Sequence, residues 1–201
     1  MLLFLDLISP ISEFSIIEDN KLILNKKITN VSNDKLSDCI FQIYQEIEKE
    51  INITKYLKKI VLTIGPGSYT NLRVGSAFAL GLKISLKIPI YPFSINDLVT
   101  IKKLNLDENN AFYIYSANQQ KFLCELNSNK DITYTKIDND KFILPEQVDK
   151  LYYNYKKINS KSVIQIKFSI LEELLQNNKY LIFNKNEIIK PIYISNNEVL
   201  N

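Results

Sequence analysis

The sequence predicts an α/β protein in which mixed β-sheets are flanked by helices. Short β-branched and aromatic runs occur in two groups, within residues 1–28 and 110–137, and such runs are typical of antiparallel meanders. Segments with helical periodicity and further apolar runs follow each group, so both halves show the order β-β-β-α-β-α. Because the pattern restarts near residue 105, we expect two domains, residues 1–104 and 105–201.

Changes of hydrophobic period mark the elements of the first half. Apolar residues recur every three or four positions between residues 33 and 51, which indicates a helix, and Asn33 or Asp34 can cap its start. The run KKIVLTIG predicts a buried strand that ends in a glycine turn. In chain order, we expect strands at 2–9, 13–19 and 21–28, a helix at 33–51, a strand at 58–65, a helix at 70–86, a strand at 88–94 and a helix at 95–105.

The second half begins with another meander and continues with mixed elements. The segment LPEQVDKLYYNYKK looks amphipathic and has Pro145 near its start, so it predicts a helix. SILEELLQNN predicts a further helix. In chain order, we expect strands at 111–117, 121–127 and 131–137, a helix at 144–157, a strand at 162–168, a helix at 169–178 and an extended segment at 191–195.

The composition excludes several classes of site. The chain has 201 residues, a net charge of +3 and no histidine, which rules out Ser-His-Asp and Cys-His triads and histidine-ligated metals. Cys39 and Cys124 fit neither a disulfide framework nor a zinc motif. No apolar stretch has the length of a membrane span. We therefore expect a reduced cytoplasmic protein with no metal and no membrane partner, in which acid–base catalysis would fall to carboxylates, lysine or tyrosine.

The glycine turn after the buried strand has the layout of an anion site. Gly65 and Gly67 allow a close backbone approach, while Ser68 or Thr70 can cap a helix whose first amides are free. The stretch matches neither the phosphate-loop nor the dinucleotide fingerprint, because the lysine of the first is missing and Leu72 replaces the third glycine of the second. A tight turn followed by a capped helix is the alternative interpretation.

The helix after the turn carries the other two glycines. Gly75 and Ala79 are four residues apart, as are Ala77 and Gly81, and small residues at this spacing let another helix approach closely. The helix is apolar nearly all round, which indicates burial on more than one side. Its second side can pack on the chain's own first helix or on a partner.

The stretch GPGSYTNLRVG, residues 65–75, resembles the signature of the TsaB family, with Asn71 in place of a usual glycine. The opening LLFLDL and the closing KPIYIS resemble the ends of that family's chains more weakly. The resemblance implies two actin-like (ASKHA, RNase H-like) lobes, the N-terminal one carrying the partner-binding helices and the C-terminal one smaller and diverged.

The resemblance also implies a function and partners. TsaB proteins are non-catalytic scaffolds in the synthesis of N6-threonylcarbamoyladenosine (t6A) in tRNA, where they pair with the catalytic paralogue TsaD, are joined by the ATPase TsaE, and meet tRNA only within the complex. A homodimer through the same helices is a further expectation. By this resemblance the partner-binding residues are Leu36, Ile40, Ile43, Tyr44, Ile47, Leu72, Arg73, Ser76, Ala79 and Leu80.

Two alternatives stay open. Asp6, with the glycine turn, can hold a metal–phosphate in actin-like folds, so an ATP-binding phosphotransferase or ATPase is the alternative function; otherwise Asp6 is a hydrogen-bonded structural residue. The family's second-lobe charges are replaced around Ser116 and at Ser195. Finally, the aromatic and basic stretch around Tyr155 can either contact RNA by stacking or line an amphipathic helix.

Overall fold

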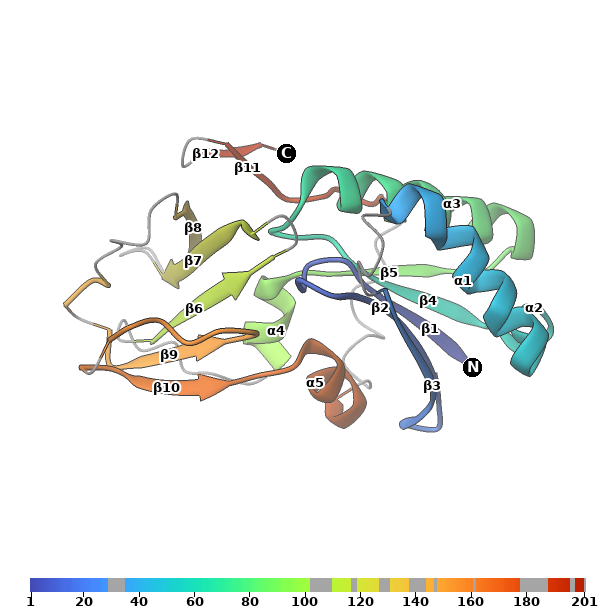
Figure 1. The fold of residues 1–201 in the computed structure, drawn as a ribbon, viewed down its shortest axis with the longest axis horizontal. Coiled ribbons are helices and arrows are strands. Elements are labelled where there is room, and N and C mark those ends of the chain that lie inside the picture. Colours follow the sequence, from blue (N-terminus) through green and yellow to red (C-terminus); the bar gives the residue numbers. More distant parts are fainter. Residues whose placement is uncertain are drawn as a thin grey trace.

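A computed structural model describes residues 1–28, 35–101, 110–116, 119–126, 131–137, 144–146, 148–160, 162–177, 188–195 and 198–200. Figure 1 shows an elongated molecule in which two sheets lie end to end with helices around them. The elements are β1 (Leu2–Asp6), β2 (Ser12–Glu18), β3 (Lys21–Ile28), α1 (Leu36–Ile51), α2 (Ile53–Tyr56), β4 (Lys59–Thr63), α3 (Tyr69–Leu86), β5 (Ile90–Phe93), α4 (Ile95–Ile101), β6 (Asn110–Tyr115), β7 (Lys121–Leu126), β8 (Ile132–Lys136), β9 (Lys150–Tyr153), β10 (Ile164–Lys167), α5 (Ile170–Asn177), β11 (Tyr193–Ser195) and β12 (Glu198–Leu200).

The first sheet has the strand order β3-β2-β1-β4-β5. β1, β2 and β3 form the expected antiparallel meander, whereas β4 pairs parallel with β1 and β5 pairs parallel with β4. Every strand and helix expected in this half is present, and the short helix α2 is an addition. The expected helix caps at residues 33 and 34, and the extension of α4 to residue 105, lie outside the described residues.

The second sheet repeats the same order, β8-β7-β6-β9-β10, with the same mixture of antiparallel and parallel pairs. The helix expected at residues 144–157 is wrong, because β9 occupies Lys150–Tyr153 and the described neighbours of β9 form no helix. β9 is a central parallel strand that is buried on both faces. Such strands have no polar side, so their sequences lack the alternation that distinguishes a strand from a buried helix.

Alternate residues of each central strand divide between separate hydrophobic clusters. On β1, Leu3 and Leu5 pack under the α1–α3 layer, whereas Phe4 points to the opposite face of the sheet. On β6, Phe112 and Ile114 face the same cluster as Phe4, and Ala111 and Tyr113 face a third cluster on the far side. This period of two fixes which sheet faces meet.

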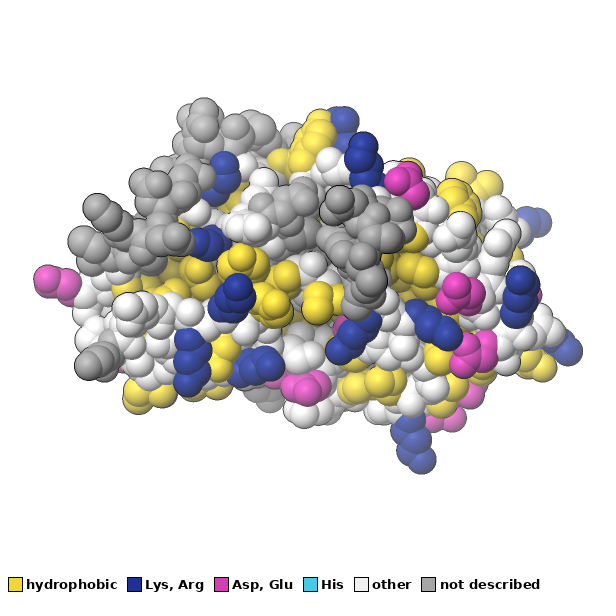
Figure 2. Space-filling model, in the orientation of Figure 1, with side chains coloured by type: hydrophobic (Ala, Val, Ile, Leu, Met, Phe, Trp, Pro, Cys, Tyr) yellow, Lys and Arg dark blue, Asp and Glu magenta, His cyan; other side chains and the backbone are white. Residues whose placement is uncertain are grey.

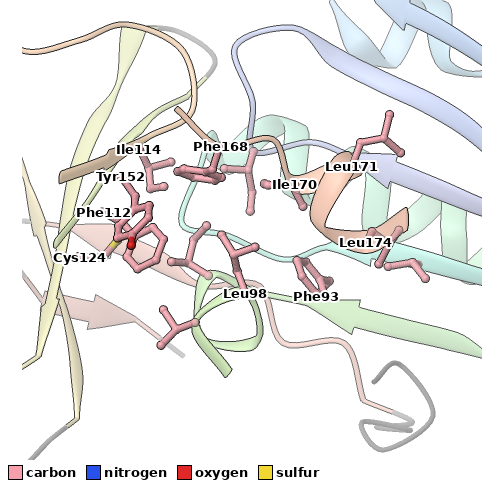
Figure 3. Packing of buried hydrophobic residues seen from close by; sticks show 14 of the residues in the cluster. Phe93, Leu98, Phe112, Ile114, Cys124, Tyr152, Phe168, Ile170, Leu171 and Leu174 are labelled. Carbon is pink, nitrogen blue, oxygen red and sulfur yellow. The ribbon is translucent and has the colours of Figure 1, made fainter. Parts of the chain in front are cut away.

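One hydrophobic cluster joins the two sheets. Figure 3 shows Leu98 of the first half lying between Phe112 of the second half and Phe93 of the first, with Leu174 of α5 on the side of Phe93. These side chains are nearly all fully buried. The two sheets are therefore held together by a dry core, and the α/β architecture of two mixed, helix-flanked sheets agrees with the predicted fold class.

The C-terminal segment returns to the first half. The backbone N–H of Ile192 donates to the carbonyl of Ile64 at the end of β4, and the ring of Tyr193 lies 4.6 Å from that of Tyr69. β11 then pairs with β12 beside β8. In the part of the chain that the structure describes, no helix combines the length and apolarity required to cross a bilayer.

Candidate functional site

The glycine turn between β4 and α3 is packed by the chain itself. Gly65 has a φ of +122°, and a Cβ there would lie 2.6 Å from the carbonyl oxygen of Ile192. On the other side, a Cβ at Gly67 would lie 3.5 Å from the Cα of Ile8, and Ser68 is buried. The backbone that comes close to these glycines is thus the chain's own, which argues against a turn that binds phosphate. Thr70, at the start of α3, is exposed.

Asp6, the other candidate anion-site residue, shapes the loop after β1. One carboxylate oxygen accepts from the backbone N–H groups of Ile8 (2.9 Å) and Ser9 (3.1 Å), and the other accepts from the Ser9 hydroxyl (2.6 Å). Thr63 holds the next amide by accepting from Leu7 N–H at 2.7 Å. Burial raises the pKa of Asp6, and these hydrogen bonds oppose the rise. The carboxylate is satisfied within its own loop, as the structural interpretation predicts.

A cleft of about 370 Å³ lies beside Asp6, between β2 and β3 of the first half and the β9–β10 region and α5 of the second. Its volume suits a small ligand. Charged residues of both signs line it: Asp6, Glu13, Lys27, Lys167 and Glu172. Three carboxylates around one cleft disfavour a bound triphosphate by like-charge repulsion. The charges that line the cleft therefore disfavour the ATP-binding alternative.

The helical layer above the first sheet is built on one aromatic side chain. Phe78 of α3 makes edge-to-face contacts with Phe14 of β2 and with Phe41 and Tyr44 of α1, with ring centroids 5.5–5.8 Å apart. Such pairs favour fixed relative positions of the elements that carry them. Figure 1 shows α1 and α3 lying side by side on the same face of this sheet.

Gly75 serves this internal packing. A Cβ on Gly75 would lie 1.8 Å from Cδ1 of Leu7, which is itself fully buried. Ala79, one turn later, is also fully buried. Gly81, in contrast, has nothing within 4 Å of the Cβ position. Of the small residues in α3, Gly75 and Ala79 thus face the chain's own core, and Ala77 and Gly81 face outward.

The ten expected partner-binding residues fall into two groups. Half-buried or exposed residues, which a partner can reach, are Ile43, Tyr44, Arg73, Ser76 and Leu80. Residues that contribute to the core below α1 and α3 are Leu36, Ile40, Ile47, Leu72 and Ala79. The resemblance pointed to whole helices, and the regularly spaced apolar residues of a helix form its buried side, so several core residues were included.

The outer side of this layer carries large apolar residues that are not among the ten expected partner-binding residues. Phe41 is 65% exposed, Tyr69 48% and Ile84 76%, and the selected Leu80 is 38% exposed. The guanidinium of Arg73 lies 4.1 Å from the ring centroid of Tyr69. The sequence feature that indicated these exposed residues was that α3 is apolar on nearly all sides. We give the name helix face to a set of exposed residues on α1 and α3: Phe41, Tyr69, Arg73, Ala77, Leu80, Gly81 and Ile84.

The repeated sheet order and the interlobe cleft define the class: this is a two-lobed α/β protein with the actin-like fold. The model of the family described as "TsaD: tRNA N6-adenosine threonylcarbamoyltransferase" matches residues 29–198. Because the match extends over most of the sequence, the chain belongs to this family.

Two solved structures from Pseudomonas aeruginosa share the fold. YeaZ has a TM-score of 0.61 at 14% identity, and a protein described as similar to peptidase YEAZ has a TM-score of 0.60 at 13% identity. Each alignment covers 96% of this chain and 99% of the other. By fold, the chain is therefore YeaZ-like, which agrees with the resemblance to TsaB, the other name of YeaZ.

Curated relatives match a shorter part. The tRNA N6-adenosine threonylcarbamoyltransferases of Buchnera aphidicola subsp. Acyrthosiphon pisum strains Tuc7 and 5A are each 35% identical over 65 residues, or 32% of this chain. The matched part is 19% of each relative, so the chain spans about a fifth of the length of the curated relatives it matches.

Proposed function

We propose that this chain is a non-catalytic subunit of the cytoplasmic machinery that makes N6-threonylcarbamoyladenosine in tRNA, and that it pairs with a TsaD partner through the helix face. Family membership supports the pathway, since the family model is named for the tRNA threonylcarbamoyltransferase. The absence of histidine and the closed glycine turn favour a scaffold over an enzyme. TsaE and tRNA are further proposed members of the assembly.

The observation that carries the proposal is the exposure of large apolar residues on α1 and α3. Phe41, Leu80 and Ile84 lie on the outward sides of two adjacent helices. Burying one large apolar side chain is worth roughly 1.5–3 kcal/mol. A partner that covers these three therefore gains a substantial part of the free energy of a stable complex.

Small residues on the helix face suit a helical partner in particular. Ala77 and Gly81 are exposed and four residues apart, and Gly81 has open space at its Cβ position. Small residues at this spacing let another helix approach closely beside the larger Leu80 and Ile84. A paralogue with the same fold would present equivalent helices, which also makes a homodimer through this face a competing assembly.

A reconstituted tRNA modification assay tests the proposed role. TsaD and the other components of the pathway are assayed with this chain, without it, and with the variant Leu80→Asp/Ile84→Asp. We expect modification to require the wild-type chain and to fall at least about tenfold with the variant, because two charges would have to be buried on pairing. Full activity without the chain, or modification by the chain in the absence of TsaD, would contradict the proposal.

A matched control separates loss of pairing from loss of folding. Ile164→Asp/Ile188→Asp places the same charges at two other exposed isoleucines, which are 61% and 69% exposed and lie outside α1 and α3. We expect this control to pair with TsaD as tightly as the wild type does. Both double variants should unfold at temperatures near that of the wild type, since all four side chains point to solvent.

A further inference from the structure

One segment of the second half carries several basic residues and no acidic one. Five of the 25 basic residues, and none of the 22 acidic ones, lie between Lys150 and Phe168. The rest of the chain, with 20 basic and 22 acidic residues, therefore has a net charge of −2. This segment contains β9, β10 and their connection, so one edge of the second sheet has a charge opposite in sign to that of the remaining chain.

The connection between β9 and β10 differs from its counterpart in the first half. There, the parallel strands β4 and β5 are joined through the 18-residue helix α3. In the second half, the described residues between the equivalent strands, 154–160 and 162–163, form no helix. Where the first lobe has a helix that packs on its sheet, the second lobe has a basic and aromatic loop.

Two amide side chains hold this loop in place. Asn154 makes a two-way contact with Tyr115, accepting from its N–H at 2.8 Å and donating to its carbonyl at 2.9 Å. Gln165 does the same for Ile158, with both hydrogen bonds at 3.0 Å, and also donates to the carbonyl of Ser160 at 3.2 Å. The loop is thus fixed before any ligand arrives, which lowers the entropic cost of binding.

Aromatic rings and ammonium groups meet on this loop. The rings of Tyr115 and Tyr155 have centroids 5.4 Å apart, and the ammonium of Lys156 lies 5.5 Å from the first and 5.6 Å from the second. Lys157 places its ammonium 6.0 Å from the ring centroid of Tyr153. Tyr155 is 43% exposed. We call Tyr115, Tyr155, Lys156 and Lys157 the tyrosine–lysine patch.

The lysines of the patch are available to a ligand. Within the described residues, neither Lys156 nor Lys157 forms an ion pair, and both are exposed. The nearby carboxylates Glu13 and Glu172 lie in the adjacent cleft, together with Asp6. Figure 2 shows Lys and Arg side chains spread across the lower part of this face. A polyanion would follow the outer lysines and avoid the acidic cleft.

We propose that the tyrosine–lysine patch binds single-stranded RNA, with an unpaired base stacked on Tyr155 and neighbouring phosphates held by Lys156 and Lys157. Aromatic rings combined with ammonium groups are the chemistry with which proteins hold single strands. The choice of RNA as ligand rests on the proposed function, because the family acts on tRNA. The patch would then guide an unpaired tRNA loop to the assembly.

The test measures RNA affinity of the full chain by fluorescence anisotropy. The probes are a labelled RNA stem-loop with an unpaired loop and a fully paired RNA of equal length. We expect the stem-loop to bind more tightly than the paired RNA, with an affinity that falls as salt rises. Lys156→Ala/Lys157→Ala and, separately, Tyr155→Ala should each weaken stem-loop binding about tenfold.

Matched controls come from a similar pair on the first lobe. Lys55 lies 5.4 Å from the ring of Tyr56, which is 46% exposed, and Lys58 is exposed nearby. Lys55→Ala/Lys58→Ala and Tyr56→Ala should change affinity less than about twofold, because only the second-lobe patch binds the loop. The proposal is overturned if the wild type fails to bind the stem-loop, if control and patch variants behave alike, or if Tyr155→Ala has no effect.

The same variants separate this inference from the proposed function. Lys156→Ala/Lys157→Ala leaves the helix face intact, so its affinity for TsaD should equal that of the wild type. Loss of RNA binding with TsaD pairing retained supports the patch as a separate site. If the wild-type chain pairs with TsaD and binds no RNA, the inference fails and the proposed function stands. If the chain binds RNA and does not pair with TsaD, only the proposed pairing is overturned.

Discussion

At the scale of single residues, two glycines in one helix have opposite surroundings. Gly75 faces the fully buried Leu7, and a Cβ there would lie 1.8 Å from the Leu7 Cδ1 atom, whereas the Cβ position of Gly81 is open. The helical spacing of the small residues was visible in the sequence, but which of them would face the core was not. That depends on where the loop after β1 ends, which is a tertiary feature.

Alanine at the two positions should therefore have opposite effects on stability. Gly81→Ala gains helix propensity and should raise the free energy of unfolding by about 0.5–1 kcal/mol. Gly75→Ala should lower it by roughly 1–3 kcal/mol, because Leu7 must move within a packed core. Urea unfolding of both variants measures the difference, and Leu7→Ala should reduce the cost at Gly75. Equal effects of the two substitutions would show that Gly75 does not contact Leu7.

Because Asp6 is buried, we expect the free energy of unfolding to depend on pH. Because burial raises its pKa above the ordinary 3.8 in the folded state, folding favours the protonated form. Its stabilising contribution is present below the unfolded pKa and is lost as pH rises through the folded one. Glu13 and Glu125, whose pKa values burial also raises, act in the same direction.

Asp6→Asn isolates this contribution. The amide oxygen can still accept from the N–H groups of Ile8 and Ser9, while the buried charge is removed. Relative to the variant, the wild type should lose free energy of unfolding as pH rises above the ordinary pKa of 3.8, as measured by urea unfolding over a series of pH values. A wild-type advantage that grows with pH would mean that the carboxylate form is the stabilised one.

At the scale of elements, the sequence predicted most segments correctly and failed at β9. β1 and β4 are buried on both faces and were still predicted, because their apolar runs are short and are bounded by turn residues, and α3 was predicted because its apolar run is too long for a strand. β9 was taken for a helix because Leu151, Tyr152 and Tyr153 are all buried, in clusters on opposite faces of the sheet. Likewise, the helix face was only partly predicted, since Phe41 lies outside the buried stripe of α1.

The contact between the C-terminal segment and the glycine turn gives a prediction at this scale. Gly65→Ala introduces a side chain at a φ of +122° and 2.6 Å from the Ile192 carbonyl, so the segment 188–195 should be displaced. Hydrogen exchange should accelerate at the Ile192 amide, which donates to Ile64. Amides in the middle of β1 should keep their relative protection. An unchanged rate at Ile192 would show that the segment does not depend on the turn.

At the scale of the whole molecule, two sheets with one strand order have diverged in their outer layers. The first keeps two helices on its outer face, on which Phe41, Leu80 and Ile84 are exposed. In the second, a short basic loop connects the equivalent parallel strands. The common topology was predictable from the repeated element order, whereas this division of surfaces required the structure, because it depends on which side of each element is covered.

The central claim is that the helix face pairs with TsaD, and a titration of purified TsaD with this chain measures it directly. We predict saturable binding at one chain per TsaD, weakened at least about tenfold by Leu80→Asp/Ile84→Asp and unchanged by Ile164→Asp/Ile188→Asp. Equal affinities for the two double variants, or no binding between folded proteins, would contradict the account.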